Sequence, residues 1–352
     1  MPTRNVALVF FCAIASVSAQ VQPIPPPPSA KPSIVYVAHN SDAIHDYEPN
    51  SRIIRTMVDR LVIAVTGQPD VAKAWASLVS PQDKVGIKIC AQGGELFTTH
   101  YDVVKAIVDG LVSAGHGRDN IIIWDRSLEG VKEAGYKQNA DNYQLRAIAP
   151  RDGYDAKATF SAPMIGKLVW GDLEYKTDKG KMPMLSDSEN TSSTSHFARI
   201  VSNDVTKIIN VPVMSNSTTN GIAGCLYNVT LPNIDNWRRF AQGSGFGMGS
   251  IAEIYGNPLI EKKVVLNIMD GLVALYAGGP QSQPNYAVHH ATIYASTDPV
   301  AIDAIALKQL DEWRKQANFP PTGALGGYVQ YASEIGLGNS QPNRIEIKHI
   351  GR

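Results

Sequence analysis

Cysteine is scarce in this chain, and its scarcity removes several classes of metal and redox site. The sequence holds 3 cysteines, of which Cys90 and Cys225 lie beyond the apolar stretch at its start. Neither belongs to a Cys-x-x-Cys pair, so a zinc ribbon and an iron–sulfur cluster both lack their ligands. Whether the two cysteines form a disulfide stays open, because a cysteine at the end of a buried strand also packs well as a free thiol.

Excess charge, long apolar runs and nucleotide motifs are missing as well. The 32 basic and 32 acidic residues balance, and no basic stripe is interleaved with aromatics, so nucleic acid is not an expected partner. Beyond the start of the chain, no apolar run approaches the ~20 residues that span a bilayer. The glycine-rich segment Gly243–Ser250 lacks the lysine and the spacing of a phosphate-binding loop. No dinucleotide fingerprint appears either, so no nucleotide cofactor is expected.

Residues 1–19 resemble a secretory signal. Arg4 supplies a positive charge, Val6–Val17 is apolar but too short to span a bilayer, and Ala19 precedes the expected cleavage point. The alternative is a retained N-terminal anchor. The proline-rich residues 20–33 predict a polyproline linker outside the core. We therefore expect a secreted or periplasmic protein without membrane association after signal removal.

One stretch predicts a complete βαβ unit. Val85–Cys90 is an apolar run of strand length, and Ile121–Trp124 is a second such run. Between them, apolar residues recur at the spacing of a helix whose opposite face is charged. Thr98 or Thr99 is expected to cap the start of this helix, and Gly115 to end it. Such units are right-handed with parallel strands, so both strands end at the same edge of a sheet.

The remaining patterns predict further helices and strands. Helices are expected at Arg52–Val65, Val71–Leu78, Leu128–Ala134, Pro232–Phe240 and Ile251–Tyr255, and from Pro299 onward behind an Asp298 cap. Strands are expected at Ile34–Val37, Leu145–Ala149, Lys207–Val213, Lys263–Met269, Ala291–Ala295 and Arg344–Ile350. Residues 150–205 are poorly patterned, and the polar segment 177–195 predicts a solvated insertion, with a lid over the site as the alternative.

These elements predict one α/β domain over residues 34–352. Its sheet is expected to be mostly parallel, with helices on both faces and a ligand cleft at the carboxyl edge. No internal repeat is present. The expected partner of such a cleft is a small-molecule ligand.

Polar side chains gather where that edge is predicted. Lys88 lies near the end of an apolar strand, where its charge needs a partner or a cavity. His100 stands at the helix start, and Asp125 follows the second strand. Lys88, His100 and Asp125 are therefore the candidate catalytic residues. The alternatives are a structural ion pair of Lys88 with Asp125 or Asp270, a capping or supporting role for His100, and a helix cap for Asp125.

Other polar residues of the same predicted edge are candidates for binding. Those expected to contact substrate are Thr99, Arg126, Asn216 and Asn228. Asp270 follows a strand, and Asp303 lies in an apolar helix turn, where a buried carboxylate needs a partner or a metal. Asp270 and Asp303 are thus candidate ligands of a divalent metal. The alternatives are helix caps for the aspartates and loop-holding contacts for the asparagines.

Three segments together resemble the family called domain of unknown function 362 (DUF362). They are Thr98-Thr99-His100, the polar loop ending at Asn228, and the segment STDPVAIDAIA at Ser296–Ala306. The resemblance covers roughly residues 80–315. It implies an α/β fold, in a family whose members are often fused to ferredoxin-type iron–sulfur modules and whose activity is mostly unassigned.

This chain departs from the family pattern at three places. It has no cysteine cluster, so the resemblance implies no electron transfer here. Where the family has lysine, proline and asparagine, Lys88-Ile89-Cys90 keeps only the lysine, and Met214–Asn220 lacks the usual lysine and histidine. A fainter similarity, in layout, is to nickel-pincer lactate racemases, which also start a helix with threonine and histidine. The lysine that would anchor their cofactor has no match, so that cofactor is not carried over.

The expected function is an enzyme that acts on a small polar or anionic metabolite by acid–base or metal-assisted chemistry. Lys88 and His100 would handle charge and protons, with the aspartates as partners or metal ligands. One alternative is a non-catalytic exported binding protein that uses the same cleft. Another is a redox accessory protein of the iron–sulfur-associated family. A divalent metal stays open as a cofactor, no iron–sulfur cluster or nucleotide is expected, and the sequence leaves the oligomeric state open.

Overall fold

The computed structural model describes residues 31–137, 143–149, 151–176, 190–241 and 248–351. The predicted signal sequence and most of the proline-rich linker lie outside these ranges, as do most of the predicted insertion and of the glycine-rich segment. Residues Lys31–Arg352 belong together by their contacts and form one unit. In the described ranges, no helix is both long and apolar enough to span a bilayer.

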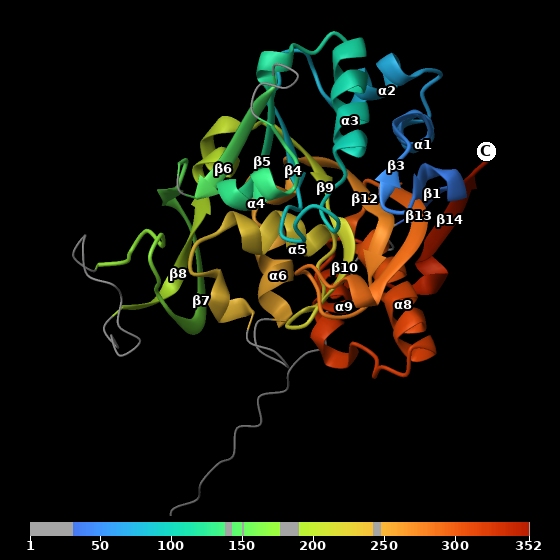
Figure 1. The fold of residues 1–352 in the computed structure, drawn as a ribbon. Helices are drawn as coiled ribbons and strands as arrows, with labels where there is room; N and C mark the ends of the chain where they lie inside the picture. Colours follow the sequence, from blue (N-terminus) through green and yellow to red (C-terminus); the bar gives the residue numbers. More distant parts are fainter. Residues whose placement is uncertain (1–30, 138–142, 150, 177–189, 242–247, 352) are drawn as a thin grey trace, which may run out of the picture. The chain divides into compact units, whose positions relative to one another are not determined.

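Ten strands of the described residues form one mixed, mostly parallel sheet (Figure 1). They are β1 (Ser33–His39), β4 (Val85–Ile89), β5 (Ile121–Ser127), β6 (Gln144–Ala149), β9 (Lys207–Val211), β10 (Val213–Ser217), β11 (Gly221–Ile222), β12 (Val264–Leu275), β13 (Ala287–Ser296) and β14 (Ile345–Ile350). The order β12–β9–β4–β5–β6 is parallel throughout. β13 is antiparallel to β12 and β1, and β14 is parallel to β1 at the outer edge. A separate small sheet pairs β2 (Ile44–His45) with β3 (Glu48–Pro49).

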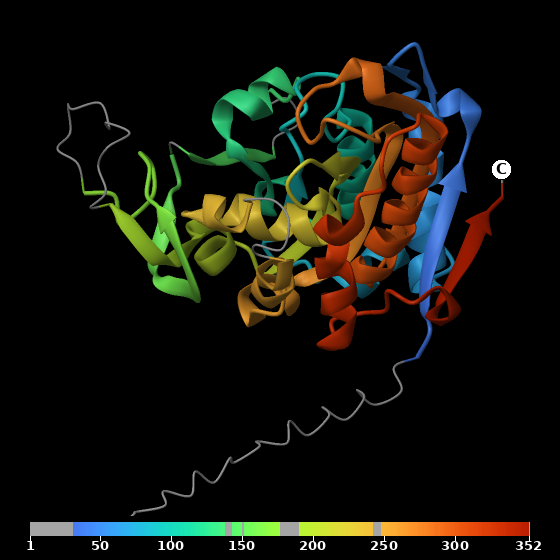
Figure 2. The same ribbon diagram turned by 90° about the horizontal axis from the view of Figure 1, so that it is seen from below.

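Helices cover both faces of the large sheet, as predicted (Figure 1, Figure 2). One face carries α1 (Ser51–Thr66), α2 (Val71–Leu78), α3 (Tyr101–Ser113) and α4 (Leu128–Glu133). The other face carries α5 (Cys225–Thr230), α6 (Met248–Tyr255), α7 (Pro258–Glu261), α8 (Pro299–Gln316) and α9 (Gly327–Glu334). Each layer of helices has its own apolar core against the sheet. The predicted α/β fold class is confirmed.

The predicted βαβ unit is confirmed as β4, α3 and β5. All of β4 and most of β5 are buried, so the strands are apolar apart from Lys88 in β4 and the polar end of β5 from Asp125. Gly115 follows the end of α3 with φ of 87°, as its position predicted. The predicted cap is wrong, because His100 occupies the N-cap position and makes no side-chain cap bond. The hydroxyls of Thr98 and Thr99 bond instead to backbone carbonyls at the strand ends.

The strand around Asp270 is longer than its pattern predicts. β12 continues to Leu275, whereas the apolar run predicted an end at Met269. The Asp270 carboxylate is fully buried, yet it accepts the backbone N–H groups of His100 and Leu272. Because these hydrogen bonds replace the water that a carboxylate otherwise binds, β12 can hold the Asp270 carboxylate in the protein interior.

The poorly patterned region contains two strands that the sequence did not predict. β7 (Tyr154–Lys167) and β8 (Thr191–Ala198) pair as a separate antiparallel sheet. The buried guanidinium of Arg239 donates to backbone carbonyls of both strands, and no apolar periodicity marks that contact. Arg239 belongs to Pro232–Phe240, which was predicted as one helix. It forms two 3₁₀ turns instead, because Asn236 interrupts them with a left-handed backbone, φ 46°.

The contact between α2 and α3 depends on a glycine. The indole of Trp75 is fully buried and lies over Gly110, in the interior of α3. A Cβ on Gly110 would lie 2.1 Å from Nε1 of Trp75, far inside van der Waals contact. Glycine at this position therefore lets the two helices approach closely.

Gly110→Ala should destabilise the protein, although alanine favours a helix interior over glycine by ~1 kcal/mol. The new methyl group has to displace Trp75, and such overpacking costs about 1–3 kcal/mol. Chemical denaturation measures the change in the free energy of unfolding. Gly117→Ala is the control, because φ is −71° there and the nearest neighbouring atom is 3.9 Å away. A Gly110→Ala variant as stable as the wild type would contradict this packing.

Candidate functional site

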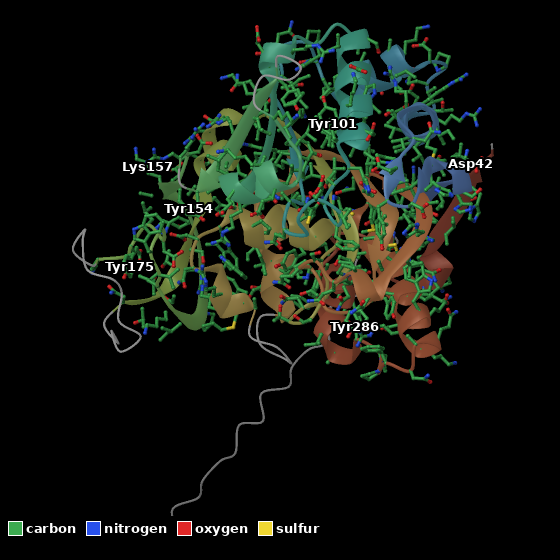
Figure 3. All side chains as sticks on the ribbon, viewed as in Figure 1. Asp42, Tyr101, Tyr154, Lys157, Tyr175 and Tyr286 are labelled. Atoms are coloured by element: carbon green, nitrogen blue, oxygen red, sulfur yellow. The ribbon has the colours of Figure 1, made fainter. Side chains whose placement is uncertain are left out.

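His100 and Asp270 form a hydrogen-bonded pair near the carboxyl ends of the parallel strands. Asp270 lies in β12, and His100 directly precedes Tyr101, the first residue of α3, which is labelled in Figure 3. One carboxylate oxygen of Asp270 is 2.8 Å from both the backbone nitrogen and Nδ1 of His100. The other oxygen accepts the N–H of Leu272. Asp270 is fully buried, and the His100 side chain is 10% exposed.

These contacts determine which ring nitrogen of His100 carries the proton. A carboxylate can only accept, so Nδ1 of His100 donates to Asp270. In the neutral ring the lone pair is therefore on Nε2, which has no hydrogen-bond partner among the described residues. A histidine held in this way can take a proton at Nε2 and return it.

The surroundings raise the pKa of His100 above its ordinary value. Burial by itself lowers this pKa, because it disfavours the charged ring. The charge of Asp270, its hydrogen bond to the ring and the charge of Asp102 together outweigh burial. The ring is therefore a stronger base than a free histidine.

The loop before His100 is tied to the ends of two strands. Thr99 accepts the N–H of Cys90 and donates its hydroxyl to the carbonyl of Val211. Thr98 donates to the carbonyl of Cys90. β4 and β9 thus hold the residue next to His100. Thr99, predicted to contact substrate, is fully buried and serves this attachment.

Lys88 forms a second buried group with Asp125 and Asn228. Its Nζ lies 2.6 Å from an Asp125 oxygen, 2.7 Å from the carbonyl of Ile89 and 3.3 Å from Oδ1 of Asn228. Three acceptors match the three N–H donors of an ammonium group. The other Asp125 oxygen accepts the N–H of Ala91, where the chain leaves β4. In this arrangement Lys88 has no donor left for a ligand.

Buried amides extend the Lys88 group across the sheet. Asn228 of α5 donates to Asn210 of β9, and Asn210 donates to Asn267 of β12. The donor–acceptor distance is 2.9 Å in both bonds. Asn267 donates in turn to the carbonyl of Ser296 at the end of β13. A buried amide is costly unless it is hydrogen-bonded, and here each one satisfies the next.

Lys88 and Asp270 extend from opposite faces of the sheet, whereas Asp125 alternates with Ile123 of the α1–α4 face and meets Lys88 at the strand ends. Lys88 reaches the α5 side, where it bonds Asn228. Asp270 bonds His100 at the start of α3, on the face that α1 to α4 cover. No hydrogen bond or ion pair among the described residues joins His100 to Lys88 or Asp125. The loop between β4 and α3 is the direct chain connection between the two groups.

Asp303 caps α5. Its two oxygens accept the backbone N–H groups of Cys225 and Leu226 at 2.6 and 2.9 Å. Burial raises the pKa of Asp303 to about 7, although those two N–H groups lower it. The carboxyl group thereby positions the helix that carries Asn228 to Lys88.

The described residues contain no group of three or more histidine, cysteine, aspartate or glutamate side chains placed to hold a metal ion. Asp270 and Asp303 each accept hydrogen bonds on both oxygens. Cys90 and Cys225 are free thiols. Burial, and then the charge of Asp125, raise the pKa of Cys90 to about 11, so it is no thiolate nucleophile at neutral pH.

Arg126 follows the buried ion pair along β5 and stacks on an indole. Its guanidinium carbon lies 4.7 Å from the ring centre of Trp237, and that of Arg238 lies 5.2 Å away. Arg126 has no hydrogen bond or ion pair with any described residue, so its donors stay available. Asn216 is buried, and its oxygen accepts the N–H of Gly279, which holds a loop.

A second histidine–aspartate pair gave no signal in the sequence. His196 of β8 directs its backbone N–H and Nδ1 to Asp235, as His100 does to Asp270. Its Nε2 faces Glu174 at 3.7 Å, so both ring nitrogens of His196 have acidic neighbours. The two residues are 39 positions apart, His196 in the poorly patterned region and Asp235 in the segment predicted as a helix, so only the fold brings them together.

Comparisons with known proteins identify a family and leave the activity open. The family model described as "Domain of unknown function (DUF362)" matches residues 85–308. No curated protein matches the chain. Among solved structures, a crystal structure of a protein from Thermotoga maritima is 11% identical, with a TM-score of 0.41. That match covers 80% of this chain and 60% of the other, and it carries no argument about function.

Removing the Lys88 ammonium should strongly destabilise the protein. Lys88→Met leaves the buried Asp125 carboxylate without its cation, and such a loss costs about 3–5 kcal/mol of unfolding free energy. Urea denaturation followed by circular dichroism measures it. Lys73→Met is the matched control, because Lys73 and its partner Asp70 are exposed, and it should change the free energy of unfolding far less than Lys88→Met does. Equal losses in the two variants would contradict the role of Lys88.

The His100 ring should titrate above the ordinary histidine pKa of about 6.5, because Asp270 favours the charged ring. NMR spectra of the ring C–H groups, recorded against pH, measure this value. Asp270→Asn removes the charge and should lower the pKa of His100. Asp235→Asn alters the similar pair at His196 and should leave the pKa of His100 unchanged. A His100 pKa that Asp270→Asn fails to lower would exclude Asp270 as the cause.

Proposed function

This chain belongs to the DUF362 family, and we propose on that premise that it is an acid–base enzyme acting on a small polar or anionic metabolite. The His100–Asp270 pair carries the proposal, because it leaves Nε2 available for proton transfer. The pair lies near the carboxyl edge of a mostly parallel sheet, where α/β proteins commonly bind ligands. Export of the mature chain, expected from residues 1–19, is part of the same proposal.

In the proposed reaction, Nε2 of His100 accepts a proton from the substrate and later returns it. Asp270 keeps Nδ1 protonated and stabilises the positive ring without taking the proton itself. The raised pKa of His100 favours that charged intermediate. Proton transfer by a positioned side chain contributes about 10²–10⁴-fold to a reaction rate.

In this proposal Lys88 and Asp125 transfer no proton and instead hold the loop that carries His100. Asp125 accepts the N–H of Ala91, at the start of the loop that ends in His100, and Lys88 holds Asp125 in place. Among the predicted substrate contacts, Arg126 keeps its donors available. It lies in β5, three strands from Asp270 in β12, and stacks on Trp237 in the opposite helix layer, so it is not assigned to the ligand of His100.

A non-catalytic binding protein is the second candidate. This candidate is supported by Lys88, whose three N–H donors all bond to protein acceptors. Lys88, predicted to be catalytic, therefore has no donor left to contact a substrate. Such a protein would bind the same class of metabolite at the same edge without proton transfer. A redox accessory role is not part of the proposal, because Cys90 and Cys225 are too few to hold a cluster.

The test incubates the protein with a mixture of small polar metabolites and follows each component by mass spectrometry. The wild type should convert a component, and His100→Gln should lower that rate about 100-fold or more while the fold is kept. Runs with and without EDTA test for a divalent metal on Asp270 or Asp303, because chelation would abolish metal-assisted conversion.

His196→Gln is the matched control for this assay, because His196 has a similar aspartate partner. Its conversion rate should stay near that of the wild type. Undiminished conversion by His100→Gln would exclude His100 as the base. Binding of a component without conversion by the wild type would favour the second candidate.

A further inference from the structure

A cavity of about 340 Å³ lies between α1 and the outer strands β1 and β14. Figure 1 shows these elements close together near the C-terminal end of the chain. Asp42, labelled in Figure 3, belongs to the 3₁₀ turn that starts directly after Asn40 in the cavity wall. A cavity of this size suits a small molecule rather than a single ion.

The charged side chains that line the cavity are cationic. Arg52 and Arg60 stand on one face of α1, with Thr56 between them at the four-residue spacing of neighbouring turns. Arg60 donates to the carbonyl of Gly351 at 2.8 Å. The guanidinium of Arg52 has no hydrogen bond or ion pair with a described residue. None of the described lining residues is acidic.

Another arginine of the same helix has a different environment. Arg55 lies outside the cavity and pairs with Asp59 at 3.0 Å and with Asp109 at 2.9 Å. The protein therefore supplies carboxylates to an α1 arginine that faces its neighbouring helices. It supplies none to Arg52 or Arg60 within the described residues, which leaves both guanidinium groups suited to an external anion.

Two asparagines add donors to this cavity. Oδ1 of Asn40 accepts the N–H of Asp42, and Oδ1 of Asn50 accepts the N–H of Ile53. Those bonds fix the orientation of each amide, because the oxygen has to face the backbone N–H. The NH₂ end of each amide is therefore the end left for other partners. Both asparagines can therefore donate hydrogen bonds to acceptor atoms of a ligand.

His39 lies in the cavity wall at the end of β1, but its ring belongs to the opposite face of the sheet. Nδ1 of His39 lies 3.1 Å from the hydroxyl of Thr292, its register partner on β13. Val37, two positions earlier on β1 and therefore on the same side of the strand, packs in the core that α5 to α9 cover. The His39 ring therefore adds no donor to the cavity.

Apolar side chains complete the cavity wall, among them Ile53, Met57 and Ile350. Cationic and amide donors beside apolar side chains match a ligand with a carbon skeleton and an anionic oxygen group. We propose that this cavity binds a small organic oxyanion, a phosphate or carboxylate compound, through Arg52 and Arg60.

This cavity is distinct from the His100–Asp270 pair. Ala38 in its wall shares a register position with Ile293, which shares one with Asp270. Two strand spacings, about 10 Å, therefore separate Ala38 from Asp270. Binding of an anion in the cavity needs no proton transfer, so this inference does not rest on the proposed reaction.

Isothermal titration calorimetry of the full chain with pyrophosphate and with citrate tests the proposal. One probe carries phosphate groups and the other carboxylates, so the preferred probe identifies the anionic group of the ligand. The wild type should bind at least one of them. Arg52→Gln loses no bond to the described residues and should weaken binding about tenfold. The double variant with Arg52→Gln and Arg60→Gln should weaken binding further.

Arg55→Gln is the matched control, because it removes the same charge from the same helix outside the cavity. In about 0.1 M salt, which screens distant charges, its Kd should stay within about twofold of the wild-type value. Asp270→Asn should also leave the Kd unchanged, which separates this site from the proposed proton transfer. Failure of the wild type to bind either probe would overturn the proposal. Equal weakening by Arg52→Gln and Arg55→Gln would overturn it too.

Discussion

A lysine ammonium buried beside a sheet has to be neutralised and fully hydrogen-bonded, and the centre of this protein is arranged around that requirement. Asp125 supplies the opposite charge to Lys88, and Asn228 supplies an acceptor from helix α5. Asn228 can do so because Asp303 holds the start of α5. Asp125 also anchors Ala91, near the start of the loop that leads to His100. One buried charge thus connects a strand, a helix and a loop.

Burial decided how much of the fold could be predicted from the sequence. β4 and β5 are covered on both faces, so their apolar runs identify them directly. α2 was predicted with its observed bounds, because Asp70 caps it and its apolar positions follow helical spacing. β7 and β8 gave no such signal. Their carbonyls are satisfied by Arg239, a contact that no periodic pattern encodes.

For the candidate site, residue types were predictable and most pairings were not. The sequence showed that Lys88 needed a carboxylate and offered Asp125 or Asp270, and the structure pairs Lys88 with Asp125. His100 and Asp270 are 170 positions apart, and their contact depends on how far β12 extends. Lys88 and Asp270 lie on opposite sheet faces because of side-chain alternation and strand order, and Asp125 reaches Lys88 at the strand ends. The sequence gives no direct access to strand order.

The cap of α5 makes the folded state sensitive to the acidity of its surroundings. An aspartate in an unfolded chain has a pKa of about 3.9, whereas burial raises that of Asp303 to about 7. The folded chain therefore holds this proton more tightly than the unfolded chain does. The stabilisation from this group is fully present below about pH 4 and is lost as the pH rises through about 7. Acidic conditions thus favour the folded form through Asp303, opposite to the effect of an aspartate whose pKa is lowered by a salt bridge.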